Sequence, residues 1–254
     1  MSPLPLQDRV ALITGAAGDL GAAIAARFLE AGARLALIDV DAAQLKARCE
    51  RELGASDRVL VLACNVADPD QTRTAVDETA RHFGALNILV NNAATESVRS
   101  AVADVSIEEW RRTLDVNLTG AWLMAKWAIP HLRAAGGGVI LNVASQLGHV
   151  ATAGSSAYSA SKAALLSLTR SIAVDCAADH IRAVSLSPGA VMTSRLTRRY
   201  GTEDEVNRAL AGKHPVGRIG RPRELAEAAL YLVSDGASFV TGSDLLADGG
   251  YTAV

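Results

Sequence analysis

The chain has 254 residues, of which 50% are hydrophobic and 20% are charged, and its formal net charge is −2. A chain of this length and apolar content buries a large core, which excludes an intrinsically disordered protein. The near-neutral charge argues against nucleic acid or an anionic membrane surface as the main partner. The apolar run 121–129 is broken by Lys126, so no segment reaches the length needed to span a membrane.

The residues before the first apolar run lack a basic region and an apolar signal core. Cys49, Cys64 and Cys176 are scattered and show neither metal-ligand nor CxxC spacing. They are typical of small core residues in a reducing compartment. We therefore expect a cytoplasmic protein.

Seven short β-rich apolar runs alternate with longer segments of helical spacing. The runs cover residues 10–14, 34–40, 58–64, 86–91, 138–143, 181–187 and, more weakly, 244–247. Continuous apolar strands that alternate with helices predict a parallel sheet covered on both faces. Right-handed crossovers make such a sheet doubly wound. The sequence therefore predicts an α/β fold of about seven strands, as one domain over residues 1–254.

The segments between these runs predict the helices. Examples with helical spacing are residues 20–30, 42–53 and 69–83. The longest stretch without a strand, residues 192–215, has a charged helical pattern around 203–210. We expect this lid segment (residues 192–215) to cross the top of the sheet and cover a site.

Ligands of open parallel sheets bind at the carboxyl ends of the strands. At each such end the chain carries a small, polar or turn-forming residue: Gly15, Asp39, Asn65, Asn91, Ser145 and Pro188.

The first of these ends opens a glycine-rich turn, residues 14–21, with the sequence TGAAGDLG. Gly15, Gly18 and Gly21 let the backbone turn sharply and approach a pyrophosphate, whose charge is met by the following helix N-terminus. Asp39, about 20 residues further on, is placed to bind both ribose hydroxyls of NAD and to repel the 2′-phosphate of NADP. No basic residue stands at positions 16, 17 or 40 to hold that phosphate. The pattern indicates NAD, and the alternative for Asp39 is a cap for the next helix.

Two further motifs complete the pattern. Residues 91–94 read NNAA, and Ser145 stands thirteen residues before Tyr158 in a Tyr-x-x-x-Lys motif that ends at Lys162. Together with the glycine-rich turn, these motifs resemble the short-chain dehydrogenase/reductase family over essentially the whole chain. The resemblance implies a Rossmann fold, an NAD(P)-dependent oxidoreductase and a homotetramer, with the helices at 107–132 and 155–178 as the main interface.

The resemblance also implies roles for individual residues. The implied catalytic residues are Asn117, Ser145, Tyr158 and Lys162. The implied cofactor-binding residues are Gly15, Gly18, Asp19, Leu20, Gly21, Asp39, Asn65, Val66, Asn91, Ala93, Tyr158, Lys162, Pro188, Gly189, Val191 and Thr193. In the family the lysine also binds the nicotinamide ribose, and the helix asparagine holds a water that links the lysine to solvent.

Three positions depart from the family's pattern: Asp19 replaces the usual middle glycine, Asn65 replaces an aspartate and Ala94 replaces a glycine. Aspartate tolerates positive φ better than most residues, so the turn can form. A carboxylate beside a pyrophosphate weakens binding unless it points away. The shifted glycines also fit the extended relatives, but the 66 residues after Pro188 are too few for their additional domain.

Oxidation of a secondary alcohol requires removal of its proton while hydride leaves. A tyrosine phenol has a reference pKa of about 10, and a nearby ammonium lowers it toward the range of a useful base. The i,i+4 spacing puts Tyr158 and Lys162 one turn apart on the same helix face. Ser145 can hold the substrate oxygen beside the phenol. Taken singly, a Tyr and a Lys at this spacing usually form only a solvated helix edge, and a strand-end serine commonly bonds to backbone. Their combination in one chain favours catalysis.

The substrate itself is less well defined. Ser145, Gln146, His149 and Tyr158 are the substrate-binding candidates, and they favour a polar molecule such as a sugar, polyol, hydroxy acid or cyclic alcohol. Further pocket candidates are Thr95, Glu96, Leu147, Ser155, Met192 and, on the lid segment, Arg195, Arg198 and Arg199. These arginines would pair with an anionic group. For the lid arginines, His149 and Glu96, the alternative is a solvated surface.

The leading prediction is an NAD-dependent dehydrogenase of a small secondary alcohol. A 3-oxoacyl-[acyl-carrier-protein] reductase is the enzymatic alternative, although that reaction generally uses NADPH. Enoyl reductases are disfavoured because they use a longer Tyr-to-Lys spacing. A non-catalytic NAD-binding regulator or scaffold is the alternative of another class. The other histidines lack ligand-like spacing, so we predict no metal site.

Overall fold

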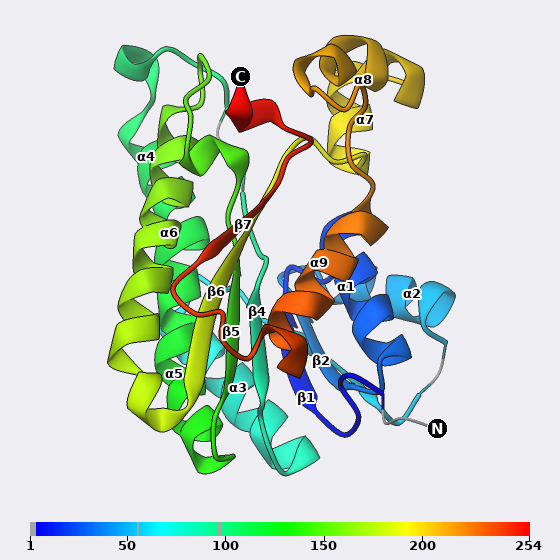
Figure 1. Ribbon diagram of the computed structural model, residues 1–254, viewed down its shortest axis with the longest axis vertical. Coiled ribbons are helices and arrows are strands. Elements are labelled where there is room, and N and C mark those ends of the chain that lie inside the picture. Colours follow the sequence, from blue (N-terminus) through cyan, green and yellow to red (C-terminus); the bar gives the residue numbers. More distant parts are fainter. Residues whose placement is uncertain (1–3, 55, 96–97) are drawn as a thin grey trace.

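The computed structural model describes residues 4–54, 56–95 and 98–254. Over these residues the chain forms one seven-stranded parallel sheet with helices on both faces (Figure 1). The strands are β1 (Val10–Thr14), β2 (Arg34–Asp39), β3 (Val59–Ala63), β4 (Ile88–Asn91), β5 (Gly138–Val143), β6 (Ile181–Pro188) and β7 (Asp244–Ala247). Each lies within two residues of its predicted bounds. The predicted doubly wound α/β fold is confirmed.

The strand order is β3-β2-β1-β4-β5-β6-β7. The chain therefore builds outward from β1 in one direction, then returns to the other side of β1 at β4. This reversal opens a crevice at the carboxyl ends of β1 and β4, which is where sheets of this topology bind ligands.

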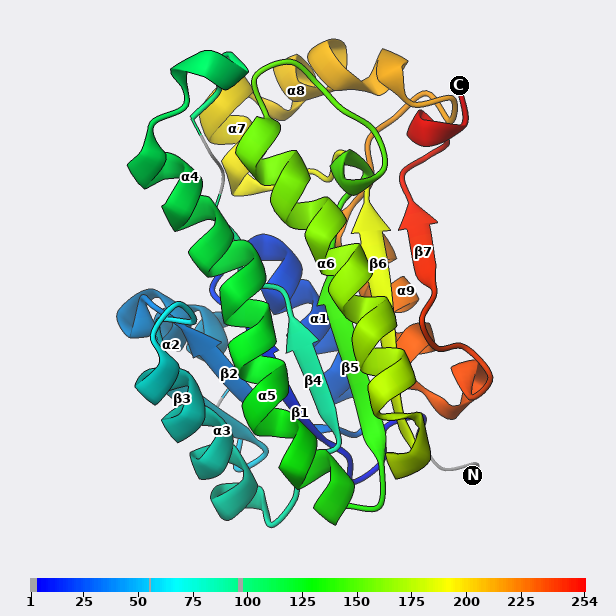
Figure 2. The same cartoon turned by 90° about the vertical axis from the view of Figure 1, so that its left-hand side faces the viewer.

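Two layers of helices cover the sheet. Figure 2 shows one layer in front of the sheet, and the other lies behind it. The front layer contains α3 (Pro69–Phe83), α4 (Ile107–Leu114), α5 (Gly120–Ala134) and α6 (Ser156–Asp175), and the other contains α1 (Asp19–Glu30), α2 (Ala42–Glu52) and α9 (Pro222–Val233).

The alternation of side chains along the strands creates a core on each face. In β1, Val10 and Leu12 pack in the cluster under α5, whereas Ala11 and Ile13 pack in the cluster under α1. All four side chains are fully buried. Burial on both faces explains why the strands read as continuous apolar runs rather than as alternating patterns.

The predicted helix at 107–132 is interrupted. After α4 the chain makes a π-helical turn over Asp115–Thr119 before α5 begins at Gly120. The wider turn brings the side chain of Asn117 into the interior, where it is 1% exposed. The buried residues here, Thr113 and Asn117, are both polar, so the spacing of apolar residues does not predict the turn.

The lid segment forms two short helices, α7 (Ser194–Tyr200) and α8 (Glu203–Leu210). Both lie beyond the carboxyl end of the sheet (Figure 2). Thr202 and Glu205 cap the start of α8 reciprocally in a capping box. Among the described residues, no helix combines the length and apolar character that crossing a membrane requires.

Candidate active site

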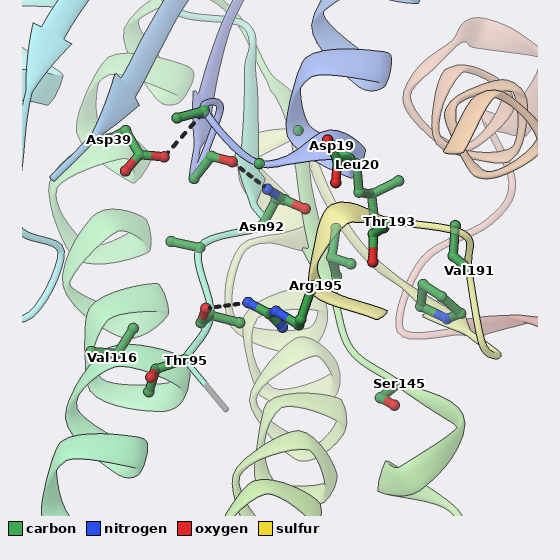
Figure 3. Close-up of a pocket in the computed structure, with 18 of the residues that line it drawn as sticks. Asp19, Leu20, Asp39, Asn92, Thr95, Val116, Ser145, Val191, Thr193 and Arg195 are labelled. Carbon is green, nitrogen blue, oxygen red and sulfur yellow. Dashed lines mark hydrogen bonds between the residues drawn. The ribbon is translucent and has the colours of Figure 1, made fainter. Parts of the chain in front are cut away.

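A cavity of about 700 Å³ lies where the carboxyl ends of the central strands meet α7 (Figure 3). The glycine-rich turn and Asp39 line one end of it, and Ser145 lines the other. Tyr158 and Lys162 also line this cavity, so most residues predicted to hold a cofactor and three of the predicted catalytic residues share one space.

The glycine-rich turn is packed tightly at two of its glycines, one against the segment that follows β4 and one against the turn itself. Gly15 has a φ of +64°, and a Cβ there would lie 2.7 Å from the Cα of Ala93. A Cβ on Gly21 would lie 2.9 Å from the Cα of Ala16. Gly18 is different, because a Cβ there would meet only the Gly15 carbonyl oxygen, at 3.4 Å. The open space at Gly18 and the uncapped N-terminus of α1 fit an anion such as a pyrophosphate.

The carboxylate of Asp19 is held by two groups from other elements. Its Oδ1 accepts a hydrogen bond from Arg48 Nη2 at 2.7 Å, and its Oδ2 accepts one from the backbone N–H of Ser194 at 2.6 Å. Partial burial opposes ionisation, but these bonds outweigh it and lower the pKa of Asp19 from its ordinary value. The negative charge at the middle-glycine position is therefore paired with an arginine.

Asp39 lies at the end of β2 beside the glycine-rich turn (Figure 3). Its Oδ2 accepts from the Ala17 N–H at 3.0 Å, and its Oδ1 accepts from the Asp41 N–H at 3.3 Å. The cap of α2 is Asp41, whose Oδ1 accepts from the Gln44 N–H at 2.9 Å. The N-cap of α2 is therefore Asp41 and not Asp39, which was the alternative interpretation of Asp39.

Asn65 and Val66 line the cavity after β3, as predicted. The Oδ1 of Asn65 accepts from the Ala67 N–H at 3.1 Å, which closes a local turn. The neighbouring Cys64 thiol is buried, and burial raises its pKa to about 11. This cysteine is therefore protonated at neutral pH and is not a nucleophile.

At the end of β4, two adjacent asparagines point to different surroundings. Asn91, a predicted cofactor residue, is buried outside the cavity lining, and its Nδ2 donates to Ala121 O and Asn142 Oδ1. Asn92 lines the cavity, and its Nδ2 donates to the carbonyl oxygens of Thr14 and Gly15 (Figure 3). Asn91 thus joins β4 to the neighbouring strand, whereas Asn92 fixes the glycine-rich turn.

The segment after β6 supplies the remaining predicted cofactor residues. Pro188, Gly189, Val191 and Thr193 all line the cavity. A Cβ on Gly189 would lie 2.7 Å from the Cα of Asp248, so only glycine fits there. The close approach of the C-terminal turn thus explains this glycine.

Tyr158 and Lys162 project from α6 into the cavity. The Lys162 ammonium lies 5.7 Å from the centre of the Tyr158 ring and donates to Val143 O at 2.7 Å. Lys162 is 2% exposed. Burial lowers its pKa to about 7, and the nearby charge of Arg195 acts in the same direction.

Ser145 follows β5 and lines the same cavity. Its Oγ accepts from the Leu147 N–H at 3.1 Å, which caps the short turn that follows. This bond is the backbone role expected of a strand-end serine, and it leaves the hydroxyl proton to be donated elsewhere. The same contact thus fixes where the hydroxyl lies.

Asn117 lies behind the cavity, outside its lining. Its Nδ2 donates to the carbonyl oxygen of Thr95 and to Ser161 Oγ, and its Oδ1 accepts from the Thr95 N–H. The asparagine therefore ties the segment after β4, which lines the cavity, to the helix that carries Tyr158.

The two predicted substrate residues after Ser145 lie outside the cavity lining. His149 Nε2 lies 2.8 Å from Asp244 Oδ2, at the start of β7. Gln146 is 9% exposed, and its Oε1 lies 3.0 Å from where a Cβ on Gly189 would stand. Their substrate roles stay predictions. Among the described residues, no group of three His, Cys, Asp or Glu side chains could hold a metal ion.

The other pocket candidates divide in a similar way. Thr95, Arg195 and Arg198 line the cavity, whereas Leu147, Ser155, Met192 and Arg199 are absent from its lining. Glu96 lies outside the described residues. Arg195 donates from α7 to the carbonyl oxygen of Ala94 at 3.1 Å, which brings its guanidinium across the cavity (Figure 3).

Sequence reasoning missed Arg48 and Arg112. Arg112 lines the cavity, where its Nη1 donates to Thr95 Oγ1 at 2.7 Å. Each arginine shares its helix with a second arginine, and only the contacts made in three dimensions show which of the two takes part in the site. Asn92 could have been found, because it directly follows a strand end.

Comparisons with known proteins agree with this geometry. A family model described as enoyl-(acyl carrier protein) reductase matches residues 15–252. Cis-4-hydroxycyclohexanecarboxylate dehydrogenase of Sinomonas cyclohexanicum is 42% identical over 97% of this chain and 98% of its own. Cyclohexanol dehydrogenase of an Acinetobacter strain is 33% identical over 97% and 96%. An NAD-dependent glycerol dehydrogenase of Listeria innocua is 35% identical over 97% and 95%.

Solved structures agree as well. A short-chain type dehydrogenase/reductase from Mycobacterium marinum superposes with a TM-score of 0.92 at 35% identity, covering 99% of this chain and 98% of that one. A 3-ketoacyl-(acyl-carrier-protein) reductase from Brucella melitensis, complexed with NADH, gives 0.89 at 34% identity, covering 97% and 99%.

The sheet, the glycine-rich turn and the Ser145, Tyr158 and Lys162 side chains in one cavity define an oxidoreductase of alcohols. The chain belongs to the short-chain dehydrogenase/reductase family.

Proposed function

We propose that the chain is an NAD-dependent dehydrogenase that interconverts a secondary alcohol and a ketone, with Tyr158 as the acid and base. One observation carries this proposal: Asp39 and the glycine-rich turn line the same cavity as Ser145, Tyr158 and Lys162. A cofactor held against Asp39 and an alcohol held at Ser145 would meet inside one space.

NAD, when bound, supplies the nicotinamide that accepts a hydride. The N–H groups at the start of α1 would face its pyrophosphate, and Asp39 would accept from its ribose hydroxyls. Asn65 and Val66 would lie beside the adenine, and Thr193 beside the nicotinamide. The carboxylate of Asp39 favours NAD over NADP because it repels a 2′-phosphate. The names of the glycerol dehydrogenase and of the NADH complex support NAD.

Ser145 would hold the alcohol oxygen, and Tyr158 would take the proton from it as hydride leaves. A charged Lys162 stabilises the phenolate form of Tyr158. Because the pKa of Lys162 is about 7, this charge changes with pH near neutrality. In the reverse direction Tyr158 returns the proton to the carbonyl. Asn117 would act by fixing Thr95 behind the substrate.

The cavity lining combines apolar walls with cationic side chains. Outside the residues predicted to bind the cofactor, apolar lining includes Ala94, Val116, Ala190 and Leu196. Arg195 and Arg198 bring positive charge from the lid segment. We propose a cyclic secondary alcohol that carries a carboxylate, because the walls fit the ring and a guanidinium fits the carboxylate. The name of the relative from Sinomonas supports this choice.

Two other functions remain as outcomes of the test. The Brucella structure supports a 3-oxoacyl-[acyl-carrier-protein] reductase. That reductase is complexed with NADH, so a preference for NAD over NADP does not argue against this function. The Tyr-x-x-x-Lys spacing argues against an enoyl reductase. A non-catalytic NAD-binding scaffold is disfavoured because Ser145, Tyr158 and Lys162 are all present in the cavity.

We also propose that the protein is cytoplasmic and forms a homotetramer. Each chain would be a single domain, in which the lid segment (residues 192–215) covers the site. Cys49, Cys64 and Cys176 are free thiols, which suits a reducing compartment. Trp110 on α4 and Trp122 on α5 are 39% and 45% exposed, which suits burial against a second copy. Light scattering coupled to size exclusion measures the assembly, and a monomeric mass would contradict the tetramer.

The decisive experiment follows nicotinamide absorbance with NAD⁺ and, separately, NADP⁺. The substrates are cis-4-hydroxycyclohexanecarboxylate, cyclohexanol, glycerol and a hydroxyacyl thioester. We expect turnover with NAD⁺ and a higher kcat/KM for the carboxylate than for cyclohexanol. Turnover of cyclohexanol alone would contradict the carboxylate and keep the dehydrogenase. Turnover of the thioester alone would establish the acyl reductase, and NADH binding without turnover of any substrate would favour the scaffold.

A further inference from the structure

Asp19 joins three elements that are far apart in the chain. It is the first residue of α1, and its carboxylate contacts Arg48 on α2 and Ser194 on α7. The Asp19 and Arg48 side chains are each 19% exposed, so the pair is largely withdrawn from solvent. Arg48 is itself held by Glu52, whose Oε1 lies 3.4 Å from Arg48 Nε.

The contact with Ser194 is made at the N-terminus of α7. Ser194 is the first residue of that helix, so its N–H has no partner within the helix. The preceding residue, Thr193, makes no side-chain cap bond. A carboxylate that accepts from the first N–H of a helix acts as its cap, and its charge is favourable beside the positive helix end. Asp19 thus caps α7 from 175 residues away.

The capped turn forms part of the cavity roof. Thr193 and Arg195, on either side of Ser194, both line the cavity. At the base of the lid segment, Met192 donates to Gly220 O, and further along Arg195 donates to Ala94 O. Asp19 therefore holds the one turn of the lid segment that faces the glycine-rich turn.

We propose that Asp19 is a positioning residue that docks the first turn of α7 on the cofactor-binding turn, while Arg48 cancels its charge. The two roles are separable. The hydrogen bond to Ser194 N–H fixes Thr193 and Arg195 above the cavity. The ion pair with Arg48 lets a carboxylate stand beside the expected pyrophosphate without repelling it. The cap itself does not depend on which alcohol the enzyme uses.

The first test deletes only the hydrogen-bond donor. Ser194→Pro removes the N–H at a first helical position, where proline is tolerated. Thr193 has φ −140° and ψ 158°, the extended conformation that a residue before proline needs. Ser194→Ala keeps the N–H and removes the hydroxyl, which also hydrogen-bonds Asp19. Proline removes both groups, so the difference between the proline and alanine variants isolates the N–H.

The readout is trypsin cleavage after Arg195, Arg198 and Arg199, which does not require substrate. We expect the proline variant to be cleaved about tenfold faster than the alanine variant, as loss of a charge-assisted hydrogen bond predicts. We also expect a raised KM for the alcohol with kcat less affected, whereas a purely structural defect would lower the active fraction and leave KM unchanged. Asp19→Ala should reproduce both effects. Equal cleavage of the proline and alanine variants would overturn the docking role.

The second test separates charge from docking by NADH fluorescence titration. Arg48→Met should weaken NADH binding about tenfold, because an uncompensated carboxylate then faces the pyrophosphate. Adding Asp19→Asn should restore affinity, since the amide keeps an acceptor and removes the charge. Arg51→Met removes an exposed arginine from the same helix and is the control. No loss with Arg48→Met, or no rescue in the double variant, would overturn the neutralising role. NADH binding by the wild type is required for this arm, and its absence would contradict the proposed function instead.

Discussion

The side-chain amide of Asn117 is bonded on both sides to the backbone of Thr95. Oδ1 accepts from the Thr95 N–H at 2.8 Å, and Nδ2 donates to the Thr95 carbonyl oxygen at 3.1 Å. The same Nδ2 donates to Ser161 Oγ, which in turn donates to the carbonyl oxygen of Tyr158. The π-helical turn thus connects a wall of the cavity to the helix that carries Tyr158.

Replacement of Asn117 by alanine should lower both stability and turnover. The variant removes the hydrogen bonds that Asn117 makes with the N–H and C=O of Thr95, which destabilises the fold by about 2 kcal/mol. Turnover should fall because the hydrogen bonds through Asn117 that hold Thr95 to α6, the helix that carries Tyr158, are lost. Denaturant unfolding and steady-state kinetics measure the two effects. Asn87→Ala, which removes a bond to the Val10 N–H at the other end of the sheet, should lower stability and leave kcat unchanged.

Replacement of Tyr158 by phenylalanine should remove turnover and keep cofactor affinity. Loss of a positioned acid and base lowers kcat by about 10²–10⁴-fold. NADH fluorescence titration should give nearly the wild-type Kd. Tyr231→Phe, on the exposed face of α9, is the matched control and should keep full activity. A Tyr158→Phe enzyme with ordinary kcat would rule out the proposed base.

Replacement of Asp39 by asparagine should shift cofactor preference toward NADP. The amide keeps an acceptor for the Ala17 N–H but removes the charge that repels a 2′-phosphate. We expect the ratio of kcat/KM for NAD⁺ to that for NADP⁺ to fall about tenfold, which is the effect of ~1.4 kcal/mol. Asp41→Ala removes the cap of α2 and should cost about 1 kcal/mol of stability with the ratio unchanged. If Asp41→Ala shifts the ratio and Asp39→Asn does not, Asp39 is not the residue that determines cofactor preference.

Replacement of Lys162 by methionine should change how stability depends on pH. The pKa of Lys162 falls from 10.5 to about 7 in the folded chain, so the unfolded chain binds more protons between these values. Wild-type stability therefore rises with pH across this window, and burial of the charge destabilises the fold most below pH 7. The methionine variant lacks this rise in stability, which amounts to about 5 kcal/mol across the whole window.

Guanidinium unfolding at several pH values and one protein concentration tests this. The stability of Lys162→Met relative to wild type should be highest near pH 6 and fall steadily toward pH 10. Loss of the bond to Val143 O shifts the whole curve and leaves its slope unchanged. Parallel curves for the two proteins would contradict a buried, depressed Lys162. Lys126→Met, at an exposed position on α5, should give a curve parallel to that of the wild type.

The strands and most of the cofactor-binding turn could be predicted because their signals are local. A strand buried on both faces must be a continuous apolar run, and a turn with Gly15 at positive φ requires glycine. The order of these signals along the chain then defines the edge of the sheet where they meet. For the same reason the spacing of Tyr158 and Lys162 on one helix face could be read directly.

Contacts between distant segments could not be predicted. His149 lies beside Asp244 and Asn91 beside Asn142 because packing places different strands together, and nothing near these residues in sequence encodes it. The π-helical turn at Asn117 could not be predicted either, because the buried residues there, Thr113 and Asn117, are polar and give no apolar signal.

By itself the sequence predicted the fold class, the end of the sheet where the candidate site lies, and the presence of Ser145, Tyr158 and Lys162 there. Only the tertiary structure decided what surrounds those groups. The sequence could state that a carboxylate stands at Asp19, but whether it repels a phosphate depends on Arg48 and Ser194, which the fold brings within hydrogen-bond distance. Electrostatic and hydrogen-bond energies depend on separations of a few ångströms, and these are set by packing rather than by position in the chain.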